Sequence, residues 1–242
     1  MVSKNLYILG TRGIPASHGG FETFANELAI FLKNRGWNVI VYCQVNSGNK
    51  IVEENWKKIK LIKIPVNFSG SLGTIIFDIK SIFHAKKMND CIYLTLGYNT
   101  AIFNFLLNKK KSINIMNMDG IEWKRRKYNF LEKLWLYINE RAGYYICDHL
   151  IADNPNIKKH LQRKNKEKKI DMIPYGAKKT TISFKKEQSI LRKLKIKKPY
   201  ALVVARPVDE NNIFEIVKTF SHLKEKLNLI VLGNYSIEDK YQ

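Results

Sequence analysis

The sequence of 242 residues has few cysteines, no long apolar run and no segment typical of a leader. Its three cysteines, Cys43, Cys91 and Cys147, form no C-x-x-C pair, which argues against a metal site. The most apolar stretch, 72–83, carries two charges and falls short of the roughly 18 residues of a membrane-spanning helix. The first ten residues are too short and too strand-like for a signal peptide. We therefore expect a cytoplasmic protein with free thiols and no bound metal.

The formal net charge is +21, and residues 158–198 carry 16 Lys/Arg against three acidic side chains. Such a surface suits an anionic membrane, a nucleic acid, or no partner at all if it reflects a general bias towards lysine. The aromatic residues do not interleave with the lysines as base-stacking platforms do, so we expect no nucleic acid. The membrane surface and the compositional bias both stay open.

Apolar runs alternate with amphipathic runs along the chain, and hydrophobic residues make up 45% of it. This alternation predicts an α/β fold, a Rossmann-like parallel sheet with helices on both faces. We expect strands at 5–9, 38–43, 59–65, 91–97, 112–120, 149–154 and 169–176, and helices at 20–35, 74–88, 100–108, 129–147 and 155–163.

The pattern changes after residue 176. Residues 177–198 are basic and weakly patterned, which indicates a connector or a peripheral helix. Strands expected at 200–205 and 228–233, with a helix at 211–224, restart the β-α-β order. A lone β-α-β unit leaves apolar faces uncovered. The sequence therefore divides into a domain at 1–176, a basic connector at 177–198, and an incomplete second Rossmann-like domain at 199–242.

The loop "GTRGIPASHGG" (10–20) follows the first strand but has neither the G-x-G-x-x-G spacing nor the Lys-Ser/Thr of a P-loop. Gly19 and Gly20 open a helix whose free N–H groups suit an anion or a polar sugar. Glu22 in the first turn suits the helix dipole, or serves only as a cap. Arg12 and His18 are available to line a cleft.

Two further segments carry candidate chemistry. In "MNMDGIEWKRRKY" (116–128), Asp119 ends a strand and is either a general base or ligand for a sugar hydroxyl, or a cap for the next helix. Glu122 follows it directly. In "VVARPVDENN" (203–212), Arg206 lies past a strand and a helix begins near Asn211, which suits a diphosphate clamp; the alternative is a surface arginine.

Taken together, the segments 10–29, 118–128, 151–157, 173–177 and 205–212 resemble, in order and spacing, the rhamnosyltransferase-like branch of glycosyltransferase family 4. The resemblance implies a GT-B fold, with the acceptor on the N-terminal domain and the nucleotide sugar on the C-terminal domain. It also implies retention of configuration without a metal, the donor diphosphate helping to deprotonate the acceptor. The protein would then supply positioning and charge stabilisation.

By this resemblance, Gly19 and Gly20 lie near the donor phosphates, Asp119 lies on the acceptor side, and Arg206 neutralises the departing diphosphate. Asn211 stands where many relatives carry a lysine. Arg12, Glu22 and Glu122 are further candidates for substrate or donor binding.

The resemblance implies transfer of a sugar, from dTDP-rhamnose, to a lipid-linked saccharide at the inner face of the cell membrane, in surface polysaccharide synthesis. The family's acidic pair that holds the donor would lie beyond Gln242. We therefore expect this chain alone to have little or no transferase activity. The alternative is a non-catalytic remnant or acceptor-binding module.

Overall fold

The computed structural model describes residues 4–17, 19–107, 110–163, 167–177, 179, 181, 183–223 and 227–233. The chain divides into two compact units, Met1–Gly176 and Ala177–Gln242.

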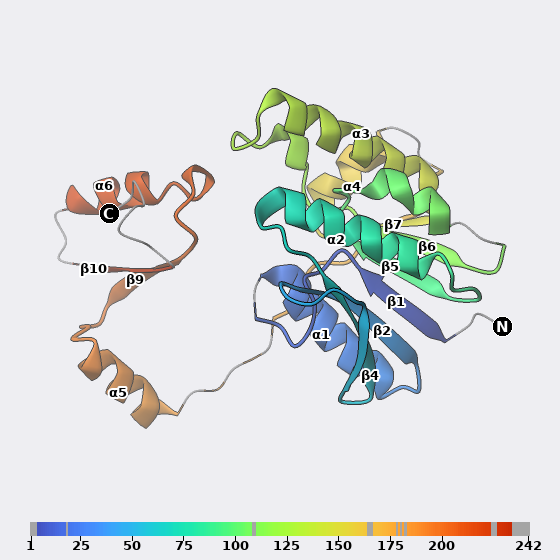
Figure 1. The fold of residues 1–242 in the computed structure, drawn as a ribbon. Helices are drawn as coiled ribbons and strands as arrows, with labels where there is room; N and C mark the ends of the chain where they lie inside the picture. The colour runs from blue at the N-terminus through green and yellow to red at the C-terminus, as the bar shows by residue number, and fades with distance from the viewer. Residues whose placement is uncertain are drawn as a thin grey trace. The chain divides into compact units, whose positions relative to one another are not determined.

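The first unit is built on an eight-stranded sheet with the order β3-β4-β2-β1-β5-β6-β7-β8 (Figure 1). The strands are β1 (Asn5–Leu9), β2 (Asn38–Val45), β3 (Val52–Trp56), β4 (Ile59–Pro65), β5 (Ile92–Leu96), β6 (Ile113–Asn117), β7 (His149–Ala152) and β8 (Ile170–Met172). The helices are α1 (Gly20–Lys33), α2 (Gly70–Ala85), α3 (Phe130–Ile146) and α4 (Pro155–Gln162), with the 3-10 helices η1 (Ala101–Leu107) and η2 (Glu122–Lys124). Among the described strands of this unit, β3 alone runs antiparallel to its neighbour. The predicted α/β class is confirmed.

The two faces of the sheet are covered by different helices (Figure 1). Ala25 and Ala29 of α1 pack in one buried cluster with Ile8 of β1 and Leu94 of β5. On the other face, α2 and η1 pack against a second cluster that contains Tyr93. Alternate residues of a strand point to opposite faces, so Tyr93 and Leu94 serve different layers. Helices α3 and α4 pack on β6 and β7 through a third cluster.

Strand β3 is absent from the sequence prediction. Four of its five residues are exposed, so the strand has no apolar alternation to reveal it. It pairs with β4 in antiparallel register, where Lys60 Nζ lies 2.7 Å from Glu53 and Lys63 forms an ion pair with Glu54. Long-range pairing with β4, rather than local pattern, makes it a strand.

Most element boundaries differ from the prediction by one or more residues, and the differences at α2, η1 and β6 are among them. Helix α2 begins at Gly70, four residues earlier than expected. The prediction placed its start too late because the glycine and serine of its first turn are weak helix formers. The segment expected as a helix at 100–108 is the 3-10 helix η1. The strand expected at 112–120 ends at Asn117, so the functional candidates that follow it lie in a loop.

The second unit contains α5 (Phe184–Lys193), β9 (Tyr200–Val204), η3 (Asp209–Asn211), α6 (Ile213–Ser221) and β10 (Asn228–Leu232). Strands β9 and β10 pair in parallel with α6 between them in sequence, so the predicted β-α-β restart is confirmed. The residues expected to form a connector or a peripheral helix contain α5, whose N-cap Ser183 accepts a side-chain bond from the Lys186 N–H. They group with the second unit.

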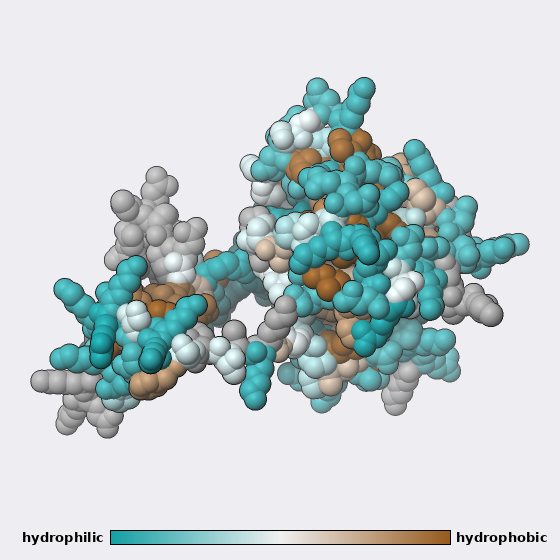
Figure 2. Space-filling model, turned by 90° about the horizontal axis from the view of Figure 1, so that it is seen from below, coloured by the Kyte–Doolittle hydropathy of each residue, from teal (hydrophilic) through white to brown (hydrophobic). Residues whose placement is uncertain are grey.

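Figure 2 shows mostly hydrophilic residues on the face that it displays, with apolar residues in small separate groups.

Candidate functional site

The strand order places a switch point at β1, because the chain adds β2 on one side of β1 and β5 on the other. In open parallel sheets, ligands bind beyond the carboxyl ends of the strands at such a point. The loops after β1 and β5 meet there. A side chain on Gly10 would lie 2.2 Å from the Leu96 carbonyl oxygen, so the close approach of the two loops requires glycine at that position.

The loop after β1 is held from inside by Glu22, which is buried. The Arg12 backbone N–H donates to Glu22 Oε1 at 3.0 Å, and the Thr11 hydroxyl lies 3.5 Å from the same oxygen. The Gly13 N–H in turn donates to Thr11 Oγ1 at 3.3 Å. Glu22, a candidate for ligand binding or a cap, thus makes contacts that support the shape of the loop.

Gly19 and Gly20 stand at the start of α1, where the N-cap makes no side-chain hydrogen bond. Neither residue has a positive φ. An added side chain would meet nothing within 4 Å at Gly20 and only Glu22 Oε2, at 3.7 Å, at Gly19. The packing of the described residues therefore does not demand glycine here. His18, the other candidate in this loop, lies outside the described residues.

Asp119 lies in the loop after β6, in the left-handed region with φ of 46°. Its N–H donates to Asn117 Oδ1 at 2.9 Å, and Asn117 Nδ2 donates to the Tyr175 hydroxyl at 3.1 Å. Burial, followed by the nearby Glu122 and Asp153 carboxylates, raises the pKa of Asp119 from 3.8 to about 6. Three carboxylates thus gather at the ends of β6 and β7.

The capping alternative for Asp119 is not found. Helix α3 is capped by Asn129, whose side chain accepts from the Glu132 N–H while Glu132 accepts from the Asn129 N–H. The short helix η2 has Ile121 at its N-cap, with no side-chain bond. The Asp119 carboxyl group is therefore not occupied with starting either helix.

Glu122 is bound within its own loop. Its carboxylate accepts two bonds from the Arg125 guanidinium, at 3.0 and 3.1 Å, and one from the Tyr128 hydroxyl at 3.3 Å. Its N–H donates to the buried Tyr98 hydroxyl at 2.7 Å, and Tyr98 donates to the Gly120 carbonyl at 3.1 Å. Glu122 thus contributes negative charge beside Asp119. Its hydrogen bonds also fix the loop that carries both residues.

Tyr175 connects the end of β6, which precedes Asp119, with helix α1. The sequence analysis did not single it out. Besides its bond with Asn117, its ring meets Phe24 of α1 edge-on, with centroids 5.7 Å apart. Burial and the nearby Asp119 raise the pKa of its hydroxyl. Tyr175 follows β8, which ends at Met172, but the strand expected at 169–176 included it, so the rule that selects residues after strands did not reach it.

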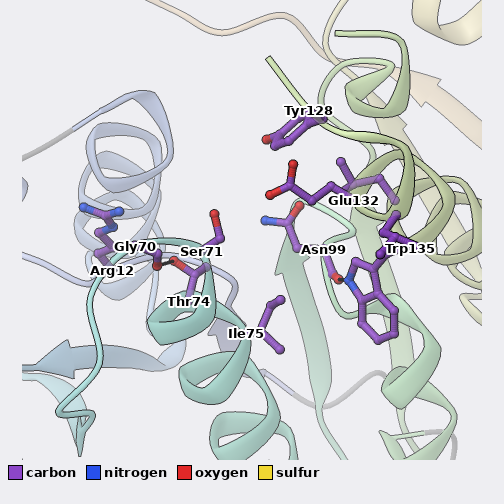
Figure 3. Close-up of a pocket in the computed structure, with 11 residues that line it drawn as sticks. Arg12, Gly70, Ser71, Thr74, Ile75, Asn99, Tyr128, Glu132 and Trp135 are labelled. Atoms are coloured by element: carbon purple, nitrogen blue, oxygen red, sulfur yellow. Dashed lines mark hydrogen bonds between the residues drawn. The ribbon is translucent and has the colours of Figure 1, made fainter. Parts of the chain in front are cut away.

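A pocket of about 550 Å³ lies beside this edge of the sheet (Figure 3). Arg12 lies on one side of the first turn of α2, and Glu132 and Trp135 of α3 lie on the other. The Trp135 indole N–H donates to the Asn99 carbonyl at 2.8 Å. This bond holds α3 to the residues after β5 on that side of the pocket. Of the predicted site residues only Arg12 lines the pocket; the helix residues were missed because they lie far apart in sequence. Its lining residues are Arg12, Gly70, Ser71, Thr74, Ile75, Asn99, Tyr128, Leu131, Glu132, Trp135 and Leu136.

Arg206 and Asn211 come together in the second unit. Both line a hollow of about 470 Å³ past the ends of β9 and β10, and Asn211 Nδ2 donates to the Arg206 carbonyl at 2.9 Å. This bond is made by the backbone carbonyl of Arg206, so the Arg206 guanidinium takes no part in it. An arginine at a strand end before a helix suits an anionic ligand.

Within the described part of the chain, no group of three or more His, Cys, Asp and Glu side chains could hold a metal ion. Over the same residues, no helix is both long and apolar enough to cross a bilayer.

A family profile described as "Domain of unknown function (DUF1972)" matches residues 3–178. The chain belongs to the DUF1972 family. The match covers the first unit, including both loops that carry the candidate residues. No curated protein matches the sequence.

Solved structures show the fold of the DUF1972 chain. The α,α-trehalose 6-phosphate synthase of Burkholderia multivorans matches with a TM-score of 0.59 and 8% identity, over 98% of this chain and 64% of that one. The UDP-N-acetylglucosamine 2-epimerase of Rickettsia bellii gives 0.56 and 15%, over 96% and 62%. A trehalose-6-phosphate structure from E. coli, bound with UDP-2-fluoro glucose, gives 0.54 and 12%, over 97% and 66%.

These similarities assign the Rossmann-like GT-B fold to the DUF1972 chain. The chain spans about two thirds or less of the length of each of these proteins. Because a synthase and an epimerase share the fold, the fold by itself does not select the reaction.

Proposed function

We propose that this chain is a glycosyltransferase that moves a sugar from a nucleoside-diphosphate donor to a lipid-linked saccharide. The observation that supports the proposal is the link between the glycine-opened helix α1, which follows β1 at the switch point, and the loop of Asp119: Phe24 of α1 meets Tyr175, which accepts a bond from Asn117, and Asn117 accepts one from the Asp119 N–H. The resemblance to the rhamnosyltransferase-like branch of glycosyltransferase family 4 supports dTDP-rhamnose as donor and surface polysaccharide as product.

In the proposed reaction, the bond between the anomeric carbon and the donor diphosphate breaks and the acceptor hydroxyl oxygen bonds to the same face of that carbon. The hydroxyl proton passes to the departing diphosphate, so the configuration is retained and no metal takes part. The protein contributes orientation and charge stabilisation.

Each candidate residue has a part in this scheme. Gly19 and Gly20 leave room for the donor phosphates at the N–H end of α1, since their space is open. Asp119 accepts a hydrogen bond from a hydroxyl of the acceptor, and a carboxyl group with a pKa of about 6 is ionised at neutral pH. Arg206, with Asn211 beside it, neutralises the diphosphate.

The donor part of the proposal is tested by calorimetric titration of the chain with dTDP, UDP and GDP. We expect one of these nucleotides to bind. Arg206→Ala should lower the affinity for it roughly 10- to 100-fold, which corresponds to the loss of one charge-assisted hydrogen bond. Arg192→Ala removes an exposed arginine from α5 of the same unit and is the matched control. Absence of binding by all three nucleotides would overturn the donor assignment.

The acceptor part is tested with dTDP-rhamnose and a lipid-linked saccharide. Binding of the saccharide that falls in Asp119→Asn, and binding of the nucleotide sugar that falls in Gly20→Ala, would support the roles given to these residues. Acceptor binding without nucleotide binding would instead identify an acceptor-binding module without chemistry.

A further inference from the structure

Helix α3 is apolar on two opposite faces. Its buried face, which includes Leu136, Gly143 and Tyr144, packs on the third core cluster and on η1. A second row of large apolar side chains points away from the core. We call this row the α3 stripe; its members are Phe130, Leu131, Leu134, Ile138 and Tyr145.

The α3 stripe follows helical geometry and is strongly exposed. Positions 130, 134, 138 and 145 fall on one side of a helix with about 3.6 residues per turn. Phe130 is 77% exposed, Leu131 73% and Tyr145 69%. Exposed apolar residues that occur singly need no explanation, but a continuous row along a helix marks an interaction surface.

The residues around the α3 stripe are basic. Residues 123–141 contain six Lys/Arg, of which Arg125 pairs with Glu122, against two Glu, and one of those, Glu140, is buried. The other, Glu132, closes the capping box of α3. Lys124, Arg126 and Lys127 are exposed immediately before the helix. An apolar helix face flanked by lysine and arginine is the pattern of helices that lie in the surface of an anionic bilayer.

The charge also argues against a second copy of this chain as the occupant. A second copy would bring the same cluster of cations to the same face, and like charges at close range repel. An anionic lipid surface supplies the opposite charge and a layer in which the apolar side chains can insert.

From these observations we infer that the α3 stripe and the basic residues before it form a docking face for an anionic membrane. The inference deepens the proposed function and rests on it for the lipid-linked acceptor. Leu131 belongs both to the stripe and to the lining of the 550 Å³ pocket, so a docked molecule places that pocket at the lipid surface.

Flotation with vesicles tests the inference, using the full chain and lipids without any nucleotide sugar or acceptor. We expect binding to vesicles of phosphatidylcholine mixed with phosphatidylglycerol, much weaker binding to phosphatidylcholine alone, and a loss of binding as salt rises. Since no substrate is present, failure here is distinct from failure of the proposed transferase activity.

The apolar contribution is tested with Phe130→Ser, Leu134→Ser and Ile138→Ser combined, which should weaken binding at least about tenfold. The matched control combines Phe31→Ser, Val52→Ser and Phe83→Ser. Their side chains are 46–54% exposed and lie on other elements, so this control should bind as the wild type does. Circular dichroism melts show whether both variants fold.

The charge contribution is tested with Lys124→Gln, Arg126→Gln and Lys127→Gln combined. The control, Lys185→Gln, Lys186→Gln and Lys193→Gln, removes the same charge from α5. Equal weakening by both would show that overall charge rather than this face attracts the vesicles. That result, no vesicle binding by the wild type, or a dimer in sedimentation that the serine variant abolishes would each overturn the inference.

Discussion

At the scale of single residues, Glu22 is the support of the loop after β1. We expect Glu22→Ala to lower the free energy of unfolding by about 1–3 kcal/mol, because the Arg12 N–H loses its acceptor. Glu22→Gln keeps an oxygen that can accept the Arg12 N–H, so its free energy of unfolding should fall by less. Urea denaturation measures the stability, and hydrogen exchange at the Arg12 amide locates the effect. Unchanged exchange in Glu22→Ala would refute the supporting role.

Asp119 makes stability depend on pH. Its pKa is raised from 3.8 to about 6 on folding, so between these values the folded state binds more protons and stability falls as pH rises. Asp119→Asn stays neutral and tolerates a positive φ. It should therefore exceed the wild type in stability at pH 8, by at most about 3 kcal/mol, and lose this advantage below about pH 4.

Urea unfolding at the two pH values checks this prediction for Asp119. The control is Asp90→Asn, an exposed aspartate that also has a positive φ, 53°. A gain for Asp119→Asn that does not change with pH would show that backbone strain, not charge, is its cause.

The residues that the sequence could identify are those that follow strands, because the carboxyl edge of a parallel sheet is a property of the fold. Asp119 and Gly19 were selected as candidates in this way. The sequence could not show that Glu22 bonds backward to Arg12, or that Arg125 and Tyr128 occupy Glu122. These contacts depend on loop conformation, which has no periodic signal.

At the scale of elements, α3 is fixed at its start by the reciprocal bonds of Asn129 and Glu132. Asn129→Ala removes an acceptor for the first turn and should lower stability by about 1 kcal/mol, whereas Asn129→Ser restores one. Thermal melts of the two variants measure the difference. Equal melting temperatures would show that tertiary packing alone determines where α3 begins.

Most elements of the first unit could be predicted from apolar periodicity because each has one face against the core. Strand β3 could not, since its exposed residues carry no such pattern. The pocket was equally hidden, because it forms where the first turns of α2 and α3 meet the residues after β5. Assemblies of distant segments require the tertiary structure.

At the scale of the whole molecule, the two units differ in their cores. The first has three buried clusters, whereas in the second Leu202 and Val204 of β9 are 52% and 73% exposed. We expect residues 1–176 made alone to unfold cooperatively, near the midpoint of the full chain. Residues 177–242 alone should show no cooperative transition, because a two-stranded sheet rarely folds independently.

Circular dichroism melts of the two fragments test this. A sharp transition in the fragment 177–242 would mean that the second unit holds a core of its own, and a large drop in the midpoint of 1–176 would mean that the first depends on the second.

The two borders of the large sheet also have a consequence for the behaviour of the protein in concentrated solution. An unpaired strand border can recruit a strand from another molecule and start a fibrous aggregate. Here one border, β3, carries the Glu53 and Glu54 ion pairs, and the other, β8, has only three residues. Both are poor templates, so the sheet is protected against growth by intermolecular strand addition.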